Sequence, residues 1–133
     1  MSPFHSRSQV LIVEDDSDLR EALSQILEDE GYGVSSAEHG RAALEWLREG
    51  SRPCLILLDL TMPVMNGWQF RAEQKQDPML ASIPVVVISA GANLAEQIVP
   101  LEIEHYIRKP IQLGQLLATV QRYCHEPDAR PDA

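Results

Sequence analysis

The feature that most constrains the fold of this chain is a repeated alternation between short apolar runs and longer stretches with helical periodicity. The apolar runs predict five strands: Val10–Val13, Val34–Ala37, Cys54–Leu58, Val85–Ile88 and Tyr106–Arg108. Strands that are apolar on both faces and alternate with helices are typical of a parallel sheet covered on both sides. We therefore predict an α/β protein with a doubly wound, five-stranded parallel sheet.

Predicted helices fill the intervals between these strands and follow the last one. In the first helix, apolar residues recur three and four positions apart and predict an amphipathic helix: Leu19, Ala22, Leu23, Ile26 and Leu27. Asp18 and Glu21 have the spacing of a capping box for that helix. Three further helices are predicted at about 41–49, 68–76 and 93–99. The buried face of the last helix is predicted to comprise Leu113, Leu116, Leu117, Val120 and Cys124.

A chain of 133 residues has the size of one ordinary domain, which we assign to residues 9–124 between disordered segments at 1–8 and 125–133. The net charge of -9 would repel phosphate backbones and anionic lipid, so we expect no binding to nucleic acid or membrane. Apolar runs stay far below the ~18 residues of a membrane span, and no signal peptide is evident. We expect a soluble, cytoplasmic protein.

Two cysteines, Cys54 and Cys124, have neither the spacing of metal ligands nor the density of a disulfide framework. Cys54 opens an apolar run, which is typical of a small core residue. We therefore expect a reducing compartment and no disulfide between them.

Polar residues with complementary chemistry follow four of the predicted strands at their carboxyl ends: Glu14 and Asp15, Asp59, Ser89, and Lys109. In open parallel sheets, ligands bind at this edge, near the point where the strand order reverses. Three carboxylates that meet there repel one another unless a cation offsets their charge, and Mg²⁺ prefers oxygen ligands. The pattern therefore predicts a Mg²⁺ site.

Asp59 ends the most apolar strand and is the best candidate for a nucleophile toward phosphorus, because the metal and Lys109 would offset charge on the reacting groups. Ser89 could donate a hydrogen bond to a phosphoryl oxygen. Each residue also has a purely structural interpretation. Asp16 and Asp18 precede a helix and are expected to cap it, and a strand-end Asp, Ser or Lys can be a turn residue or a surface charge. Only the combination favours phosphoryl chemistry.

These residues lie in segments that resemble the receiver domain of two-component response regulators, from about Val10 to Tyr123. The matching segments are LIVEDDSDLR (11–20), LILLDLTMPVMNG (55–67), VVVISAGA (85–92) and YIRKP (106–110). The resemblance implies a flavodoxin-like (βα)₅ fold with strand order 2-1-3-4-5. It also implies that Asp59 accepts a phosphoryl group from a histidine kinase or a phosphotransfer protein.

The resemblance further implies roles for single residues. Glu14, Asp15, Asp59 and the backbone carbonyl of Thr61 would hold Mg²⁺. Ser89 and Lys109 would contact the phosphoryl group, and Tyr106 would be the aromatic residue that changes rotamer on activation. Receivers of this kind dock their kinases on the first helix, where Leu19 and Ala22 lie one turn apart. Leu19 could instead belong wholly to the core.

The chain departs from the family pattern between Ser89 and Lys109, an interval that is short and contains Pro100. In addition, Glu102–His105 stands where a Gly-Ala pair often precedes the fifth strand. The fourth helix is therefore poorly defined. In receivers this helix, with the fifth strand and fifth helix, commonly engages a downstream protein or a second receiver, so a homodimer through that face is one expected assembly.

We predict a phosphorylatable signalling switch that is not an enzyme beyond its own phosphorylation and dephosphorylation. A degenerate receiver that acts as a constitutive interaction module is the alternative. A haloacid-dehalogenase-like phosphohydrolase is disfavoured because Thr61 stands where a second Asp would serve as acid and base. A nucleotide or flavin binder is disfavoured because the first strand–helix turn is acidic rather than glycine-rich. Residues 125–133 leave no room for an output domain, so we expect a stand-alone regulator, although an excised receiver would look similar.

Overall fold

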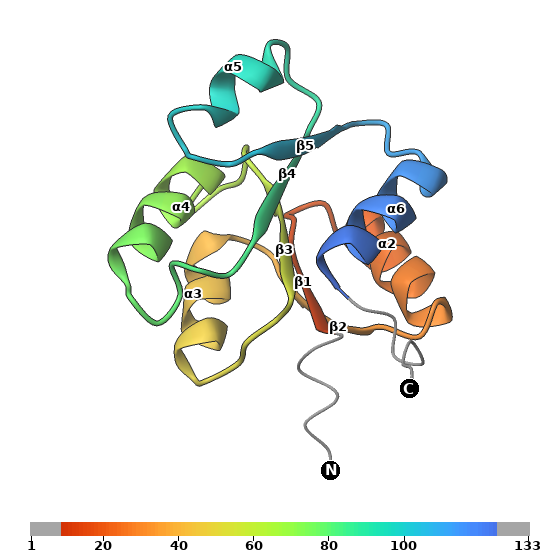
Figure 1. Cartoon of the computed structure of the whole chain (residues 1–133), viewed down its shortest axis with the longest axis horizontal. Helices are drawn as coiled ribbons and strands as arrows, with labels where there is room; N and C mark the ends of the chain where they lie inside the picture. Colours follow the sequence, from red (N-terminus) through yellow and green to blue (C-terminus); the bar gives the residue numbers. More distant parts are fainter. Residues whose placement is uncertain (1–8, 125–133) are drawn as a thin grey trace.

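The computed structural model describes residues 9–124, which form a central parallel sheet between two layers of helices (Figure 1). The strands are β1 (Gln9–Val13), β2 (Gly33–Ala37), β3 (Leu55–Asp59), β4 (Val85–Ser89) and β5 (His105–Arg108). They are ordered β2-β1-β3-β4-β5, and each neighbouring pair is parallel. The predicted fold class, the doubly wound topology and the strand order are all confirmed.

The helices divide between the two faces of the sheet (Figure 1). One face packs against α2 (Ser17–Asp29) and α6 (Leu113–Tyr123), and the other against α3 (Gly40–Arg48), α4 (Gly67–Gln76) and α5 (Leu94–Ile98). Every residue of β3 and β4 is buried, because successive side chains enter opposite helical layers. Among helices in the described part of the chain, none is long and apolar enough to cross a bilayer.

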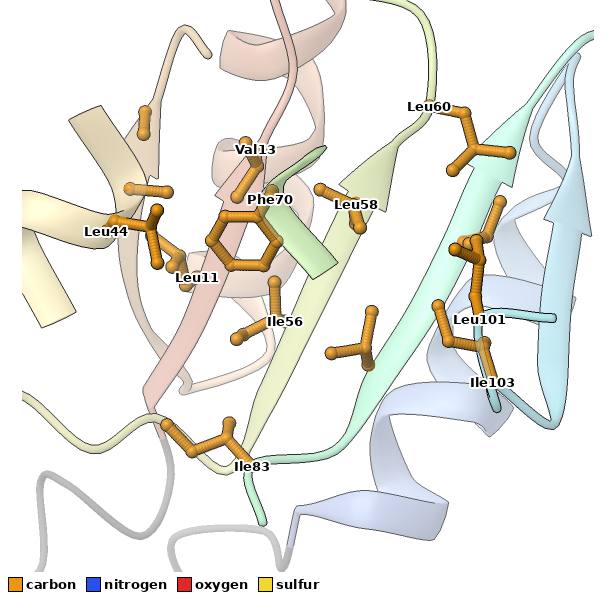
Figure 2. Close-up of a cluster of buried hydrophobic side chains, with 14 of the residues drawn as sticks. Leu11, Val13, Leu44, Ile56, Leu58, Leu60, Phe70, Ile83, Leu101 and Ile103 are labelled. Carbon is orange, nitrogen blue, oxygen red and sulfur yellow. The ribbon is translucent and has the colours of Figure 1, made fainter. Parts of the chain in front are cut away.

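The core on the α3–α4 face is built around the only phenylalanine in the described residues, Phe70. Figure 2 shows its ring among side chains of β1 and β3, including Leu11, Val13, Ile56 and Leu58. All of these residues are fully buried. Burying a side chain of this size stabilises a fold by about 1.5–3 kcal/mol, so Phe70 contributes strongly to holding α4 against β1 and β3.

Two expectations about the helices are wrong. The cap of α2 is Asp16, whose Oδ1 accepts hydrogen bonds from the N–H groups of Asp18 (3.0 Å) and Leu19 (3.2 Å). Asp18 therefore lies inside the first turn and forms no capping box. Leu113, predicted to be buried, is 54% exposed because it is the first residue of α6, and burial of that helix begins one turn later at Leu116.

The segment that follows the short α5 is held by a buried polar side chain of α4. Arg71, which is 9% exposed, donates hydrogen bonds to the backbone carbonyls of Leu101 (2.9 Å) and Glu102 (3.0 Å). Its third donated bond goes to Gln74 Oε1 (2.7 Å). Since Glu102 has a left-handed backbone (φ 59°), these bonds fix a turn that the sequence does not favour.

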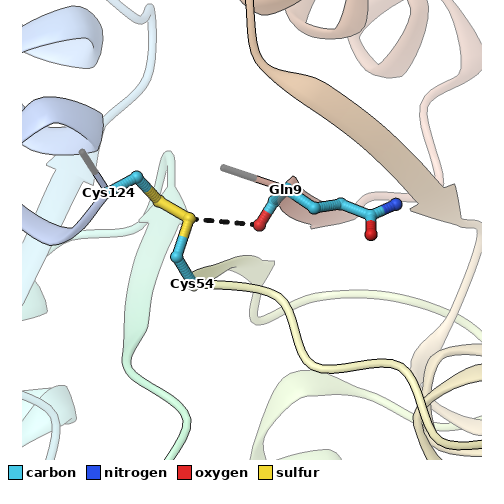
Figure 3. The surroundings of a disulfide bond; sticks show 3 residues. All are labelled: Gln9, Cys54 and Cys124. Carbon is cyan, nitrogen blue, oxygen red and sulfur yellow. Dashed lines mark hydrogen bonds between the residues drawn. A yellow bond between two sulfur atoms is a disulfide. The ribbon is translucent and has the colours of Figure 1, made fainter. Parts of the chain in front are cut away.

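The expectation of two unlinked cysteines is also wrong. Cys54, immediately before β3, and Cys124, the C-terminal cap of α6, form a disulfide with 5.4 Å between their Cα atoms (Figure 3). The N–H of Cys54 donates to the carbonyl of Gln9 (2.8 Å), which fixes this end of β3 against β1. The two cysteines are 70 residues apart, and the sheet topology alone brings them together.

We predict that reduction of this disulfide lowers stability. A crosslink spanning 70 residues limits the freedom of the unfolded chain, an effect of up to about 4 kcal/mol in the chain-entropy model. Dithiothreitol should therefore lower the midpoint of thermal unfolding by roughly 10 °C. The Cys54→Ser variant is the control: it should melt near the reduced wild-type protein and not respond to the reductant. Two observations together would contradict the disulfide: a thermal midpoint of the wild-type protein that reductant does not change, and two free thiols in the protein without reductant.

Candidate functional site

A pocket of about 550 Å³ opens at the carboxyl edge of the sheet, where β1, β3, β4 and β5 end. Its walls include every strand-end residue singled out from the sequence: Glu14, Asp15, Asp59, Ser89 and Lys109. Thr61, on the loop after β3, also lines the pocket. The fold therefore brings together side chains that are separated by up to 95 positions along the chain.

The acidic cluster consists of Glu14, Asp15 and Asp59, which each offer one carboxylate oxygen within 4.8 Å of the others. Glu14 and Asp59 are 1% and 4% exposed, whereas Asp15 is exposed. Burial raises the pKa of Glu14, even though its Oε2 accepts a hydrogen bond from the N–H of Asp16 (3.0 Å), and the nearby charge of Asp59 adds to the increase. Crowded oxygen ligands of this kind fit a hard divalent cation such as Mg²⁺.

Lys109 connects the acidic cluster to the end of β5. Its Nζ lies 3.0 Å from Glu14 Oε1 and 3.5 Å from Asp59 Oδ2. Burial alone lowers the pKa of Lys109, but its interactions with Glu14 and Asp59 outweigh burial, so the pKa is raised and the side chain stays charged. The N–H of Lys109 also donates to the carbonyl of Ser89 (2.9 Å), which joins the ends of β4 and β5.

Asp59 is held by the backbone that follows it. Its Oδ1 accepts a hydrogen bond from the N–H of Thr61 (3.3 Å), and the N–H of Gly67 donates to the carbonyl of Leu60 (2.9 Å). A Cβ atom at Gly67 would lie 2.7 Å from both Asp59 O and Leu60 Cα, so only glycine fits there. The first turn of α4 therefore packs directly against the backbone of Asp59.

Ser89 ends β4, and Tyr106 lies on the neighbouring strand β5. Ser89 is buried, and its Oγ accepts a hydrogen bond from the N–H of Gly91 (3.3 Å). Tyr106 is half-buried against the core, and the Arg108 guanidinium lies 5.9 Å from its ring centroid. Arg108 also donates to the carbonyl of Gly91 (2.8 Å). The movement of Ser89 and Tyr106 during activation stays a prediction.

The two candidate docking residues lie on α2 outside the pocket lining. Leu19 is half-buried and packs partly against the core, and Ala22 is exposed. A residue missed in the sequence analysis is Arg20, whose Nη1 donates to the carbonyl of Glu14 (2.7 Å) and holds the start of α2 beside the acidic cluster. Its only signal was a cation six positions after Glu14.

A parallel sheet of this order, with an acidic cluster and a lysine at its carboxyl edge, defines a response regulator receiver domain. The family model described by that name matches residues 10–121. The chain belongs to this family. Its members are generally signalling switches rather than enzymes, and they partner with histidine kinases.

Three curated relatives are similar over nearly the whole chain. An uncharacterized 14.6 kDa protein of Leptolyngbya boryana is 32% identical over 128 residues, covering 93% of this chain and 97% of that protein. The alkaline phosphatase synthesis regulator SphR of Synechococcus elongatus is 30% identical, covering 93% of this chain and 51% of SphR. The DNA-binding response regulator MtrA of Mycobacterium tuberculosis is 33% identical, covering 94% and 54%. The chain thus spans about half the length of SphR and of MtrA.

Two solved structures have the same fold. The chemotaxis protein CheY4 of Vibrio cholerae superposes with a TM-score of 0.79 at 28% identity, covering 87% of this chain and 98% of CheY4. The phosphorylated cyanobacterial phytochrome response regulator RcpA superposes with a TM-score of 0.73 at 33% identity, covering 86% and 89%.

We predict that Gly67→Ala distorts the site. The added methyl group would collide with the backbone of Asp59 and Leu60, which should lower the free energy of unfolding by about 1–3 kcal/mol in urea denaturation. Gly114→Ala is the matched control, because Gly114 lies in a helix and a Cβ atom there would meet nothing within 4 Å. It should be neutral or stabilising by up to about 1 kcal/mol. Equal stability of the two variants would contradict the close packing at Gly67.

Proposed function

We propose that the protein is a phosphorylatable signalling switch that takes a phosphoryl group onto Asp59 from a phosphohistidine of a histidine kinase or phosphotransfer protein. The observation that carries the proposal is the position of Lys109 Nζ, 3.5 Å from Asp59 Oδ2 and 3.0 Å from Glu14 Oε1. One cation thus lies between the nucleophile and a second buried carboxylate at the mouth of an acidic pocket.

The proposed metal ligands are Glu14, Asp15, Asp59 and the backbone carbonyl of Thr61. When bound, Mg²⁺ would offset the charge of the carboxylates and of the phosphoryl oxygens. In the transfer itself, an Asp59 carboxylate oxygen forms a bond to phosphorus as the bond from phosphorus to the donor nitrogen breaks. The electron pair of that bond stays with the imidazole. Lys109 stabilises the negative charge of the transferred group, and the Ser89 hydroxyl donates a hydrogen bond to it.

The proposed output follows from the same residues. A phosphoryl group on Asp59 would give the Ser89 hydroxyl a new acceptor. In the structure, Ser89 Oγ accepts a hydrogen bond from the N–H of Gly91, and the carbonyl of Gly91 accepts one from Arg108. A shift of Ser89 therefore reaches β5 beside Tyr106. The surface formed by α5, β5 and α6 is the proposed binding face for a downstream protein or a second copy of the chain.

We predict that Asp59→Asn folds normally but accepts no phosphoryl group, because the amide keeps the shape of the carboxylate and loses the nucleophile. The protein would be incubated with Mg²⁺ and acetyl phosphate and then weighed intact. Wild-type protein should gain one phosphoryl group, and EDTA should abolish the gain. Asp18→Asn, an exposed change outside the pocket, is the control and should be labelled normally. A folded wild-type protein that takes no label would instead be an interaction module.

We also propose that the kinase rests on α2 at Leu19 and Ala22, since both lie just beyond the acidic cluster and Ala22 is exposed. Ala22→Glu should slow phosphotransfer from a histidine kinase that labels the wild-type protein by about tenfold, equivalent to about 1.4 kcal/mol. Labelling by acetyl phosphate and thermal stability should not change. Ala72→Glu, an exposed change on α4 across the sheet, is the matched control. Equal kinase rates for both variants would reject docking at this surface.

A further inference from the structure

Trp68 is the one large apolar side chain among the described residues that line the pocket around Asp59. It is 40% exposed. The other lining residues are charged, small or polar, and include Ala90, Gly91 and Gln97. An exposed indole beside a charged site is not explained by packing of the core, and the proposed transfer chemistry does not use it.

The position of this indole is tied to the position of Asp59. Trp68 follows Gly67, whose N–H binds the carbonyl of Leu60 and whose Cα leaves no room for a side chain against the Asp59 backbone. The same turn carries a complete capping box, in which the Asn66 side chain accepts from the N–H of Gln69 and the Gln69 side chain accepts from the N–H of Asn66. The backbone beneath Trp68 is therefore fixed, and only its side-chain torsions remain free.

The pocket is larger than the phosphoryl group and a cation require. A water molecule takes a share of about 30 Å³ in the liquid, so a volume of about 550 Å³ leaves room for a donor group as well. In an in-line transfer the leaving group departs on the side of phosphorus opposite Asp59. Asp59 is buried, whereas Trp68 lines the same pocket and is 40% exposed, so a donor that enters from solvent can meet the indole.

We propose that Trp68 is a specificity-determining residue that packs against the imidazole ring of the phosphohistidine donor. This inference rests on the proposed function of Asp59. A contact between two aromatic rings that forms in the transition state should raise the rate of transfer by about 2- to 10-fold. In the step, the phosphorus–nitrogen bond breaks and the Asp59 oxygen–phosphorus bond forms. The imidazole leaves with the electron pair, neutral if its other nitrogen already carries a proton.

The experiment compares two small donors that both transfer phosphorus from nitrogen: phosphoimidazole, which carries the ring, and phosphoramidate, which does not. Labelling rates would be measured by intact mass for the wild-type protein and for Trp68→Ala and Trp68→Phe. Trp68→Ala should lower the ratio of the phosphoimidazole rate to the phosphoramidate rate by about 2- to 10-fold. Trp68→Phe should largely keep the ratio. Met79→Ala is the matched control, since Met79 is 66% exposed and lies outside the pocket lining.

The outcomes separate this inference from the proposed function. If no donor labels the wild-type protein at Asp59, the proposed function fails. If the wild-type protein is labelled and Trp68→Ala leaves the ratio unchanged, the role of Trp68 is overturned while the proposed function stands. A variant that slows both donors equally, or that melts at a lower temperature with the same ratio, would show that Trp68 only supports the site.

Discussion

The structure depends on one electrostatic constraint, the placement of Lys109 between two buried carboxylates. Glu14 follows β1 and Asp59 ends the neighbouring strand β3, and burying either charge without a partner would destabilise the fold. The pairing requires β1, β3 and β5 to end at the same level, as their register through β4 provides: Val13 pairs with Leu58, Asp59 with Ile88, and Ile88 with Ile107. Packing of the apolar strands sets this register, and the register brings the polar residues at the strand ends within reach of one another.

Most of the fold could be predicted from the sequence because its signals are local. β3 and β4 are continuous apolar runs, and such runs indicate strands that are buried on both faces. The clustering of the candidate site residues could be predicted for a related reason: parallel strands end at one edge of the sheet, so polar residues at the ends of several strands line the same pocket. Asp16 as a helix cap could also be read locally, because a cap depends on residues two and three positions away.

Three features could not be predicted because they depend on contacts between distant segments. The hydrogen bonds from Arg71 reach carbonyls that lie 30 and 31 positions away, and nothing in the sequence near Arg71 indicates them. The exposure of Leu113 depends on where α6 begins to meet the sheet, which helical periodicity does not specify. The disulfide depends on the strand order, which places the start of β3 beside the end of α6.

The disulfide also determines how α6 can move. Cys54 immediately precedes β3 and Asp59 ends it, whereas Lys109 lies four residues before α6 and Cys124 is the C-terminal cap of α6. The two segments are joined covalently at one end and by an ion pair at the other. With 11 residues, α6 is about 16 Å long, and its C-terminal cap is the point that is covalently bound to the start of β3. Any movement of α6 relative to β3 is therefore limited most at Cys124 and least at Leu113, four residues after Lys109.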